Sequence, residues 1–365
     1  MNADFAPFPP KTGAAPSAAP PIGPDAPWLA PMAGFTDLPF RLLCRERGCV
    51  CAVTEMVSAK GLCYDSKGTT DLLATCPKDA PFVVQLFGSD EECLKMAMDM
   101  LLERGVAYFD LNAGCPAPKV VKTGAGAALL KKPGLLARLA AVMTERAGPG
   151  RTGVKIRLGM TPQTPVYLEL AKSLEDAGAA WLTLHPRYAS QGFSGRADLD
   201  ALARFKKASA LPVIASGDLF TAMDAARCLA RTGADGVMFA RGALYDPGVF
   251  SRFTALMRGD AAGAAPPTGP EIAGVIRRHA ELARQYGSGR RSLLKMRTAA
   301  PRYLRDVPGS RLLRVRLCRC NSWEELEDIA AEVEAGRVAD PVSALQGADG
   351  AEEAALADIR EDPGQ

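Results

Sequence analysis

The chain has 365 residues, of which 48% are apolar, so it is long enough to bury the core of one large domain and a smaller second one. The first 27 residues are rich in Ala and Pro but lack the apolar core of a signal peptide, and no apolar run approaches the roughly 20 residues of a membrane span. With a net charge of only +3, these properties exclude the secreted and membrane-spanning classes and predict a soluble cytoplasmic protein whose ten cysteines are reduced thiols.

Residues 1–27, which contain paired prolines, are predicted to form a disordered tail. A regular alternation of short apolar runs with helix-like patterns then fills residues 28–258, and the apolar residues within 90–104 recur at helical spacing. The predicted strands are 28–32, 51–56, 81–87, 107–112, 152–157, 180–185, 212–216 and 235–239. This alternation predicts an α/β fold, a parallel (β/α)8 TIM barrel, with a doubly wound open sheet as the alternative. The G-x-G-x-x-G of a Rossmann nucleotide site does not follow the first strand.

The chain changes in composition and charge after the predicted barrel. Residues 259–270 are rich in Gly, Ala and Pro and are predicted to be a linker. Residues 271–336 lack strand-like alternation and predict a small all-helical C-terminal domain, in which the segment 277–319 is densely basic. That density favours a polyanion-binding surface, and a solvated helix face is the alternative. Residues 337–365 are predicted to form a disordered acidic tail.

Polar or glycine-containing segments occur at the end of each predicted strand, where the βα loops of a barrel share one face. They are Ala30–Asp37, Glu55–Met56, Gln85–Gly88, Asn112–Pro116, Lys155–Arg157, His185–Arg187, Ser216–Asp218 and Ala240–Gly242. Polar groups at strand ends are costly unless they bind something, so their recurrence at every strand predicts a ligand site. The last two segments place Gly217 and Gly242 near Arg241, as is typical of the phosphate pocket of such barrels, and ordinary turn geometry is the alternative for the glycines.

Three more of these side chains, Gln85, Lys155 and His185, are predicted to point inward as hydrogen-bond donors. A buried lysine is costly unless it meets negative charge or electron-rich oxygens, and a flavin ring offers acceptors to both Lys155 and Gln85. His185 is one of only two histidines, so neither a Ser-His-Asp triad nor a two-histidine metal site is expected, and we predict no metal. A satisfied structural histidine is the alternative for His185.

One thiol, Cys115, stands in a loop after the strand at 107–112, with Gly before it and Pro after it. A cysteine held there by a constrained backbone can face a ligand, and simple packing in the core is the alternative. An unperturbed thiol has a pKa near ~8.5, and no histidine lies nearby in the sequence to ionise this one. Cys115 is therefore better suited to donate a proton than to act as a nucleophile.

Together these motifs resemble those of the flavin-dependent tRNA-dihydrouridine synthases, over the range from about Trp28 to Asn321. The segments that carry the resemblance are Ala30–Gly34 with Thr36 and Asp37, Gln85–Gly88, Asp110–Pro116, Lys155–Arg157 and Gly217–Asp218. The resemblance implies an FMN-bound barrel that uses NADPH to reduce particular uridines of tRNA to 5,6-dihydrouridine. The chain departs from the family pattern at Ser216, Ala240 and Pro186, where the family usually has Asn, Gly and Gly.

The resemblance also implies roles for individual residues. The cofactor would be held by Pro31, Met32, Ala33, Gln85, Lys155, His185, Ser216, Gly217, Asp218, Ala240 and Arg241. A hydride would pass from flavin N5 to C6 of the uracil, and a proton would pass from Cys115 to C5. The tRNA would be contacted, mostly at its phosphates, by Asn112, Lys119, Lys122, Arg187, Arg290, Arg291, Lys295 and Arg297. We expect a monomer without an obligatory protein partner.

Three other functions stay open on the sequence alone. A flavin barrel that reduces a small-molecule pyrimidine or enoate would share the phosphate pocket and Lys155, but it would not need the basic helical domain. An RNA-binding protein whose barrel has lost activity would carry no flavin. A flavin-free aldolase or isomerase would use Lys155 to form a Schiff base.

Overall fold

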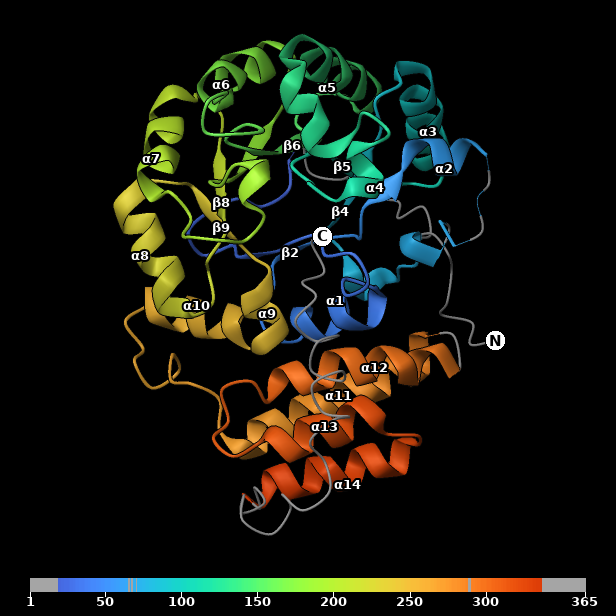
Figure 1. The fold of residues 1–365 in the computed structure, drawn as a ribbon, viewed down its shortest axis with the longest axis vertical. Helices are drawn as coiled ribbons and strands as arrows, with labels where there is room; N and C mark the ends of the chain where they lie inside the picture. The colour runs from blue at the N-terminus through green and yellow to red at the C-terminus, as the bar shows by residue number, and fades with distance from the viewer. Residues whose placement is uncertain (1–18, 65, 67, 70, 288–289, 337–365) are drawn as a thin grey trace.

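The computed structural model describes residues 19–336 except 65, 67, 70, 288 and 289. Figure 1 shows a ring of helices around parallel strands and, below it, a stack formed by the last four helices. The predicted tails lie outside the described residues over 1–18 and 337–365. Within the described ranges, no helix is long and apolar enough to cross a membrane.

The strands form one parallel sheet that closes on itself. In chain order they are β1 (Trp28–Leu29), β2 (Cys51–Val53), β3 (Val57–Ser58), β4 (Phe82–Phe87), β5 (Tyr108–Ala113), β6 (Thr152–Arg157), β7 (Trp181–His185), β8 (Val213–Ser216) and β9 (Gly236–Phe239). Their order in the sheet is β2-β1-β9-β8-β7-β6-β5-β4-β3, and the pairing of β2 with β4 closes the ring. The predicted barrel is confirmed, the alternative of an open sheet is wrong, and the short β3 is an addition to the eight predicted strands.

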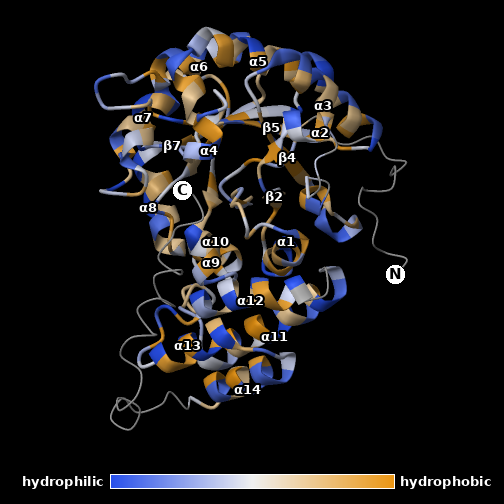
Figure 2. Ribbon diagram, turned by 45° about the vertical axis from the view of Figure 1, so that its right-hand side comes forward, coloured by the Kyte–Doolittle hydropathy of each residue, from blue (hydrophilic) through white to orange (hydrophobic). Residues whose placement is uncertain are grey.

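Helices cover the outside of this ring. They are α1 (Leu38–Arg45), α2 (Ala59–Cys63), α3 (Glu91–Glu103), α4 (Pro118–Val121), α5 (Pro133–Ala147), α6 (Tyr167–Asp176), α7 (Leu199–Ala208), α8 (Ala222–Thr232), α9 (Arg241–Tyr245) and α10 (Val249–Met257). Side chains in the sequence fix where several of them begin: the Asp90 carboxylate accepts from the N–H of Cys93 at the start of α3, and Thr221 forms a capping box with Asp224 at the start of α8. In Figure 2 these helices alternate between hydrophobic and hydrophilic colours, as amphipathic helices around a core should.

Large side chains fill the interior of the barrel at the N-terminal ends of the strands. Trp28 and Trp181 meet edge to face with their ring centroids 5.7 Å apart, and Ile214 and Met238 pack in the same buried cluster. Gly153 makes room for this packing, because a Cβ at that position would lie 2.1 Å from the Trp181 ring. The interior is therefore solid at the N-terminal ends of the strands, and space for a ligand exists at their C-terminal ends.

The segment 19–27, which the sequence assigned to the disordered tail, instead has a defined place against the barrel. The indole N–H of Trp28 donates to the carbonyl of Pro21 at 2.8 Å, and Ile22 packs against the cluster around Trp28 and Trp181. Pro20, Ala26 and Pro27 are buried. The prediction was wrong here because it relied on the Pro-rich composition and on the lack of periodicity. The segment is ordered by its contacts with Trp28, which composition does not show.

The C-terminal part consists of α11 (Gly269–Tyr286), α12 (Arg290–Tyr303), α13 (Arg311–Arg319) and α14 (Trp323–Glu334), so the predicted helical domain is confirmed. It begins two residues earlier than predicted, because Thr268 caps α11 in a capping box with Glu271. This domain packs on α1 through buried groups. The ring of Phe40 lies 5.7 Å from the ring of His279, whose Nδ1 is 2.8 Å from the Tyr303 hydroxyl.

Candidate active site

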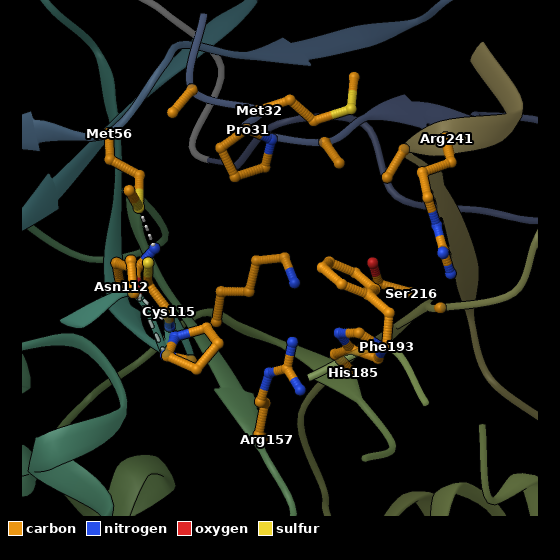
Figure 3. Close-up of a pocket in the computed structure, with 18 of the residues that line it drawn as sticks. Pro31, Met32, Met56, Asn112, Cys115, Arg157, His185, Phe193, Ser216 and Arg241 are labelled. Carbon is orange, nitrogen blue, oxygen red and sulfur yellow. Dashed lines mark hydrogen bonds between the residues drawn. The ribbon is translucent and has the colours of Figure 1, made fainter. Parts of the chain in front are cut away.

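A pocket opens at the C-terminal ends of the strands, where the sequence predicted a ligand site (Figure 3). Its walls come from segments that are far apart in the chain. Those named in the sequence prediction are Pro31, Met32, Ala33, Asn112, Cys115, Lys119, Lys155, His185, Ser216, Gly217, Asp218, Ala240 and Arg241. The barrel therefore brings most of the predicted cofactor-binding residues together around one cavity.

Cys115 lies in this pocket on a tightly held loop. The Asn112 side-chain oxygen accepts from the backbone N–H groups of Gly114 at 3.1 Å and Cys115 at 2.9 Å, and the carbonyl of Cys115 accepts from Ala127 N–H at 2.9 Å. Gly126 is needed beneath the loop, since its φ is +59° and a Cβ there would lie 2.7 Å from the carbonyl oxygen of Cys115.

Partial burial sets the protonation of this thiol. Burial raises the pKa of Cys115, while a hydrogen bond from Ala117 N–H and the charges of Arg157 and Lys119 act in the opposite direction without cancelling the rise. The sulfur is therefore a protonated thiol at neutral pH. The surrounding cations would stabilise the thiolate that remains after the proton has left.

Lys155 extends from the middle of the barrel into the cavity, from a position beside Asn112 on β5 and Thr183 on β7. Among the described residues, its ammonium has no ion-pair partner within 4.0 Å. Burial and the charge of Arg157 lower the pKa of Lys155, and the Asp110 carboxylate beneath it opposes that shift. An electron-rich ligand in the pocket would satisfy this cation.

Arg157 and His185 form the neighbouring wall. The Arg157 guanidinium donates to the carbonyls of Tyr188 at 3.1 Å and Gly192 at 2.9 Å, and it thereby holds the loop that carries Phe193. His185 is buried, and burial together with the charges of Arg157 and other nearby cations lowers its pKa well below the usual range. His185 is therefore neutral at pH 7, and its Nε2, 3.3 Å from the Arg187 guanidinium, is placed to accept.

The opposite end of the pocket is suited to a phosphate. Arg241 is held between two rings, with its guanidinium carbon 4.5 Å from the Phe193 centroid and 4.8 Å from the Phe220 centroid. Gly217 has a φ of +113°, and a Cβ there would lie 2.6 Å from the His185 ring, so the backbone stays bare beside the cavity. A fixed guanidinium next to exposed backbone fits a phosphate monoester.

The Asp218 carboxylate lines this end of the pocket and is bonded to groups of the protein. Its carboxylate accepts from Arg187 at 2.7 Å, from Arg241 at 3.1 Å and from Ala197 N–H at 2.8 Å. Burial works against the charged form, yet the hydrogen bonds from Arg187 and Ala197 lower the pKa of Asp218. A permanent anion would repel a phosphate, so we assign Asp218 the task of holding Arg241 in place.

Gln85, predicted to bind the flavin, does not line the pocket. It is fully buried beneath the floor, where its amide nitrogen donates to Asp110 at 2.6 Å and its amide oxygen accepts from Asn112 at 2.8 Å. The sequence places Gln85 near the end of a strand, but it does not show that Asp110 on the next strand accepts a hydrogen bond from the Gln85 amide. Arg187, predicted to contact tRNA, is likewise buried and engaged with Asp218, away from the surface.

The remaining residues predicted to contact tRNA are divided between two surfaces. Lys119 is exposed on α4 and lines the pocket, and Lys122 is exposed just after the same helix. On α12, Arg291 is exposed and Lys295 pairs with Asp37 at 2.7 Å, whereas Arg297 donates to the carbonyl of Cys320 at the end of α13. The side chain of Arg290 lies outside the described residues.

The acidic helix α14 neutralises part of the basic segment that precedes it. Arg277 of α11 pairs with Glu327 at 2.6 Å and Glu334 at 2.8 Å, and Arg316 of α13 pairs with Glu332 at 2.7 Å. On the side that faces the barrel, Arg305 lies over the Tyr245 ring at 4.1 Å. Two cations of the predicted polyanion surface are therefore neutralised by α14.

Four residues near the catalytic groups received no role in the sequence prediction. Met56, Phe193 and Arg157 line the pocket, and Asp110 is buried below it. Arg157 and Asp110 stood inside recognised motifs, so a signal existed for both. Phe193 lies between Gly192 and Gly195, both with positive φ, but the sequence alone does not show that this flexible-looking loop folds inward.

Comparison with known proteins shows the family of this chain. A family model described as dihydrouridine synthase (Dus) matches residues 28–338. The chain is 35% identical over 311 residues to a protein named probable tRNA-dihydrouridine synthase from Mycobacterium tuberculosis, an alignment that covers 82% of this chain and 79% of that protein. It is 34% identical over 293 residues to tRNA-dihydrouridine synthase B of Pseudomonas aeruginosa, covering 80% and 87% respectively. Among solved structures, morphinone reductase in complex with tetrahydroNAD aligns with a TM-score of 0.45 at 14% identity, over 64% of this chain and 86% of that one. The chain therefore belongs to the dihydrouridine synthase family.

Proposed function

We propose that this protein is an FMN-dependent, NADPH-driven synthase that reduces specific uridines of tRNA to 5,6-dihydrouridine. The observation that carries the proposal is the position of the Cys115 thiol in a pocket that also presents Lys155 and Arg241. The relatives named tRNA-dihydrouridine synthases support the substrate class. Because tRNA is the proposed substrate, we infer that the enzyme acts in the cytoplasm.

The residues present fit a flavin mononucleotide. Arg241 and the bare backbone at Gly217 would hold the phosphate, Lys155 would meet the electron-rich edge of the ring system, and Pro31 and Met32 would supply an apolar wall. The bound flavin would supply the hydride that adds to C6 of the uracil. Gln85 would contribute indirectly, through its hydrogen bond to Asn112.

Cys115 would complete the reduction by protonating C5. Its raised pKa keeps the proton on the sulfur at neutral pH, and Arg157, Lys119 and Lys155 would stabilise the thiolate that forms. A positioned general acid of this kind contributes about 10²–10⁴-fold to a rate. The neutral His185 would act as a hydrogen-bonding group to the ligand and not as the acid.

The target uridine must leave its stack to enter the pocket. Extruding a base costs on the order of a few kcal/mol, which contacts elsewhere on the RNA have to offset. Lys119 and Lys122 beside the mouth, with Arg291 on α12, are placed to contact phosphates. Recognition would then depend on RNA shape and charge more than on base identity.

The decisive experiment follows reoxidation of the reduced flavin. The holoenzyme is reduced with NADPH without oxygen, and the flavin spectrum is followed after addition of unmodified tRNA, free uracil or a small enoate. We expect rapid reoxidation by tRNA alone, with dihydrouridine detected in the product RNA. Reoxidation by the small molecules but not by tRNA would instead establish the rival small-molecule reductase.

A further inference from the structure

A continuous line of hydrogen bonds runs from the buried interior to the loop of Cys115. The Asp110 carboxylate accepts from the amide nitrogen of Gln85 at 2.6 Å, and the amide oxygen of Gln85 accepts from the amide nitrogen of Asn112 at 2.8 Å. The Asn112 amide oxygen then accepts from the backbone N–H groups of Gly114 and Cys115. All three side chains of this line are almost fully buried.

The hydrogen-bond partners along the line fix the orientation of the side-chain amides of Gln85 and Asn112. The nitrogen of Gln85 donates to a carboxyl oxygen of Asp110, and its oxygen faces the nitrogen of Asn112. Backbone N–H groups can only donate, so the oxygen of Asn112 must face the loop. An amide rotated by 180° would therefore oppose two acceptors or two donors in a dry interior, where an unsatisfied group costs about 1–3 kcal/mol.

We propose that Asp110 is a positioning residue, which acts through Gln85 and Asn112 to fix the backbone of Gly114 and Cys115 and hence the place of the reactive sulfur. Asp110 does not touch the pocket and is separated from the thiol by two side chains. The arrangement explains why a carboxylate is kept in the barrel interior. Its other oxygen, Oδ1, has no hydrogen-bond partner among the described residues.

A purely structural role for Asp110 would give a different outcome from a positioning role. The interior of the barrel already has a solid apolar layer beneath it, around Trp28 and Trp181. Moreover, burial raises the pKa of Asp110, so the charged carboxylate is a cost to the folded state. Replacing Asp110 should consequently disturb the thiol more than it disturbs the fold.

The test measures the reactivity of Cys115 directly and needs neither cofactor nor RNA. Full-length protein is alkylated with iodoacetamide across pH 7–10, and the modification of the Cys115 peptide is followed by mass spectrometry. Asp110→Ala and Gln85→Leu should each release the loop and expose the sulfur to water, which lowers the pKa that burial raises. A one-unit fall should speed alkylation of Cys115 below the thiol pKa by about threefold, because the gain in thiolate is partly offset by the lower nucleophilicity of a less basic thiolate. The double variant should be no faster than either single variant, because both break the same line.

Two further variants keep the test decisive. Asp110→Asn preserves the shape and one acceptor, so it should fold even if Asp110→Ala does not, and it should give a smaller acceleration than Gln85→Leu. Thr183→Val is the matched control: Thr183 is buried on β7, its hydroxyl has no partner among the described residues, and it lies outside the line. This variant should alkylate at the wild-type rate.

Wild-type pH profiles of Cys115 in Asp110→Asn and Gln85→Leu would overturn the proposal, as would equal acceleration by Thr183→Val. Turnover provides a second measurement, which rests on the proposed function: kcat should fall while the KM for tRNA stays unchanged. Altered alkylation in a protein that reduces no tRNA would refute the proposed function and leave the positioning role of Asp110 intact.

Discussion

In the proposed reaction, the proton on the Cys115 sulfur completes the reduction of the uracil. We expect Cys115→Ala to retain its FMN, because the sulfur is not among the groups assigned to hold the cofactor, and to lose about 10²–10⁴-fold of its turnover. Flavin absorbance after gel filtration measures the first effect, and dihydrouridine formation measures the second. Since burial raises the thiol pKa, wild-type turnover should not fall through loss of this proton until the pH exceeds the usual value for a thiol, about 8.5.

The matched control for this substitution is Cys228→Ala. Cys228 is also buried with a raised pKa, but it lies on α8 outside the pocket and should leave turnover unchanged. Normal turnover in Cys115→Ala would show that the proton comes from another donor.

Single residues also show where sequence reasoning ends. The positions of Cys115, Lys155 and Arg241 at strand ends could be predicted, because a barrel gathers strand ends on one face. The burial of Gln85 and Arg187 could not, because it depends on which partner stands beside each side chain: Asp110 for the first and Asp218 for the second. Long polar side chains at one strand end can point into the pocket or beneath it, and spacing does not distinguish the two.

At the scale of elements, the helices differ in the charge that they offer to a polyanion. Lys119 and Lys122 on and after α4 are exposed, whereas Arg277 and Arg316 are paired with carboxylates of α14. Each lost phosphate contact flattens the dependence of log K on log salt by about 0.7–0.9. We therefore expect Lys119→Gln with Lys122→Gln to flatten the slope of tRNA binding by roughly 1.5.

Arg277→Gln with Arg316→Gln is the comparison for that measurement. It removes the same number of cations, but from ion pairs, and the slope should stay close to that of the wild type. Equal flattening in both double variants would mean that net charge, and not the placement of α4, governs binding. Filter binding or fluorescence anisotropy over a range of salt concentrations gives the slopes.

Element types were predictable because strands and helices of an α/β barrel differ in period and length. The boundaries were less so. Residues 19–27 have no periodicity and are ordered by contact with Trp28, and the short β3 follows β2 after a gap of three residues. Thr268 and Glu271 did carry a readable capping signal, which the proline beside them obscured.

At the scale of the whole molecule, a buried histidine joins the two domains. Burial lowers the pKa of His279 to about 4, while the unfolded chain binds this proton near pH 6.5. The unfolded state therefore binds more protons than the folded state between those values, and stability should fall as the pH is lowered from 6.5 towards 4. The shift corresponds to a loss of about 3 kcal/mol at the acid end.

Thermal or urea unfolding at several pH values would measure this loss. His279→Gln cannot take up the proton, so the fall in stability attributable to this site should disappear, although the variant starts from a lower stability because Tyr303 loses its ring partner. An unchanged pH dependence in His279→Gln would assign the acid sensitivity to other groups.

The layer of large side chains around Trp28 and Trp181, against which residues 20–27 pack, fills the barrel interior at the N-terminal ends of the strands, and the pocket lies at their C-terminal ends. If NADPH and tRNA both reach the cofactor from this side, as the proposed function requires, they would bind in turn and each would leave before the other binds. Steady-state kinetics with both substrates varied should accordingly give parallel double-reciprocal lines. The rate at which the two substrates replace one another in the pocket would then set an upper limit on the turnover rate.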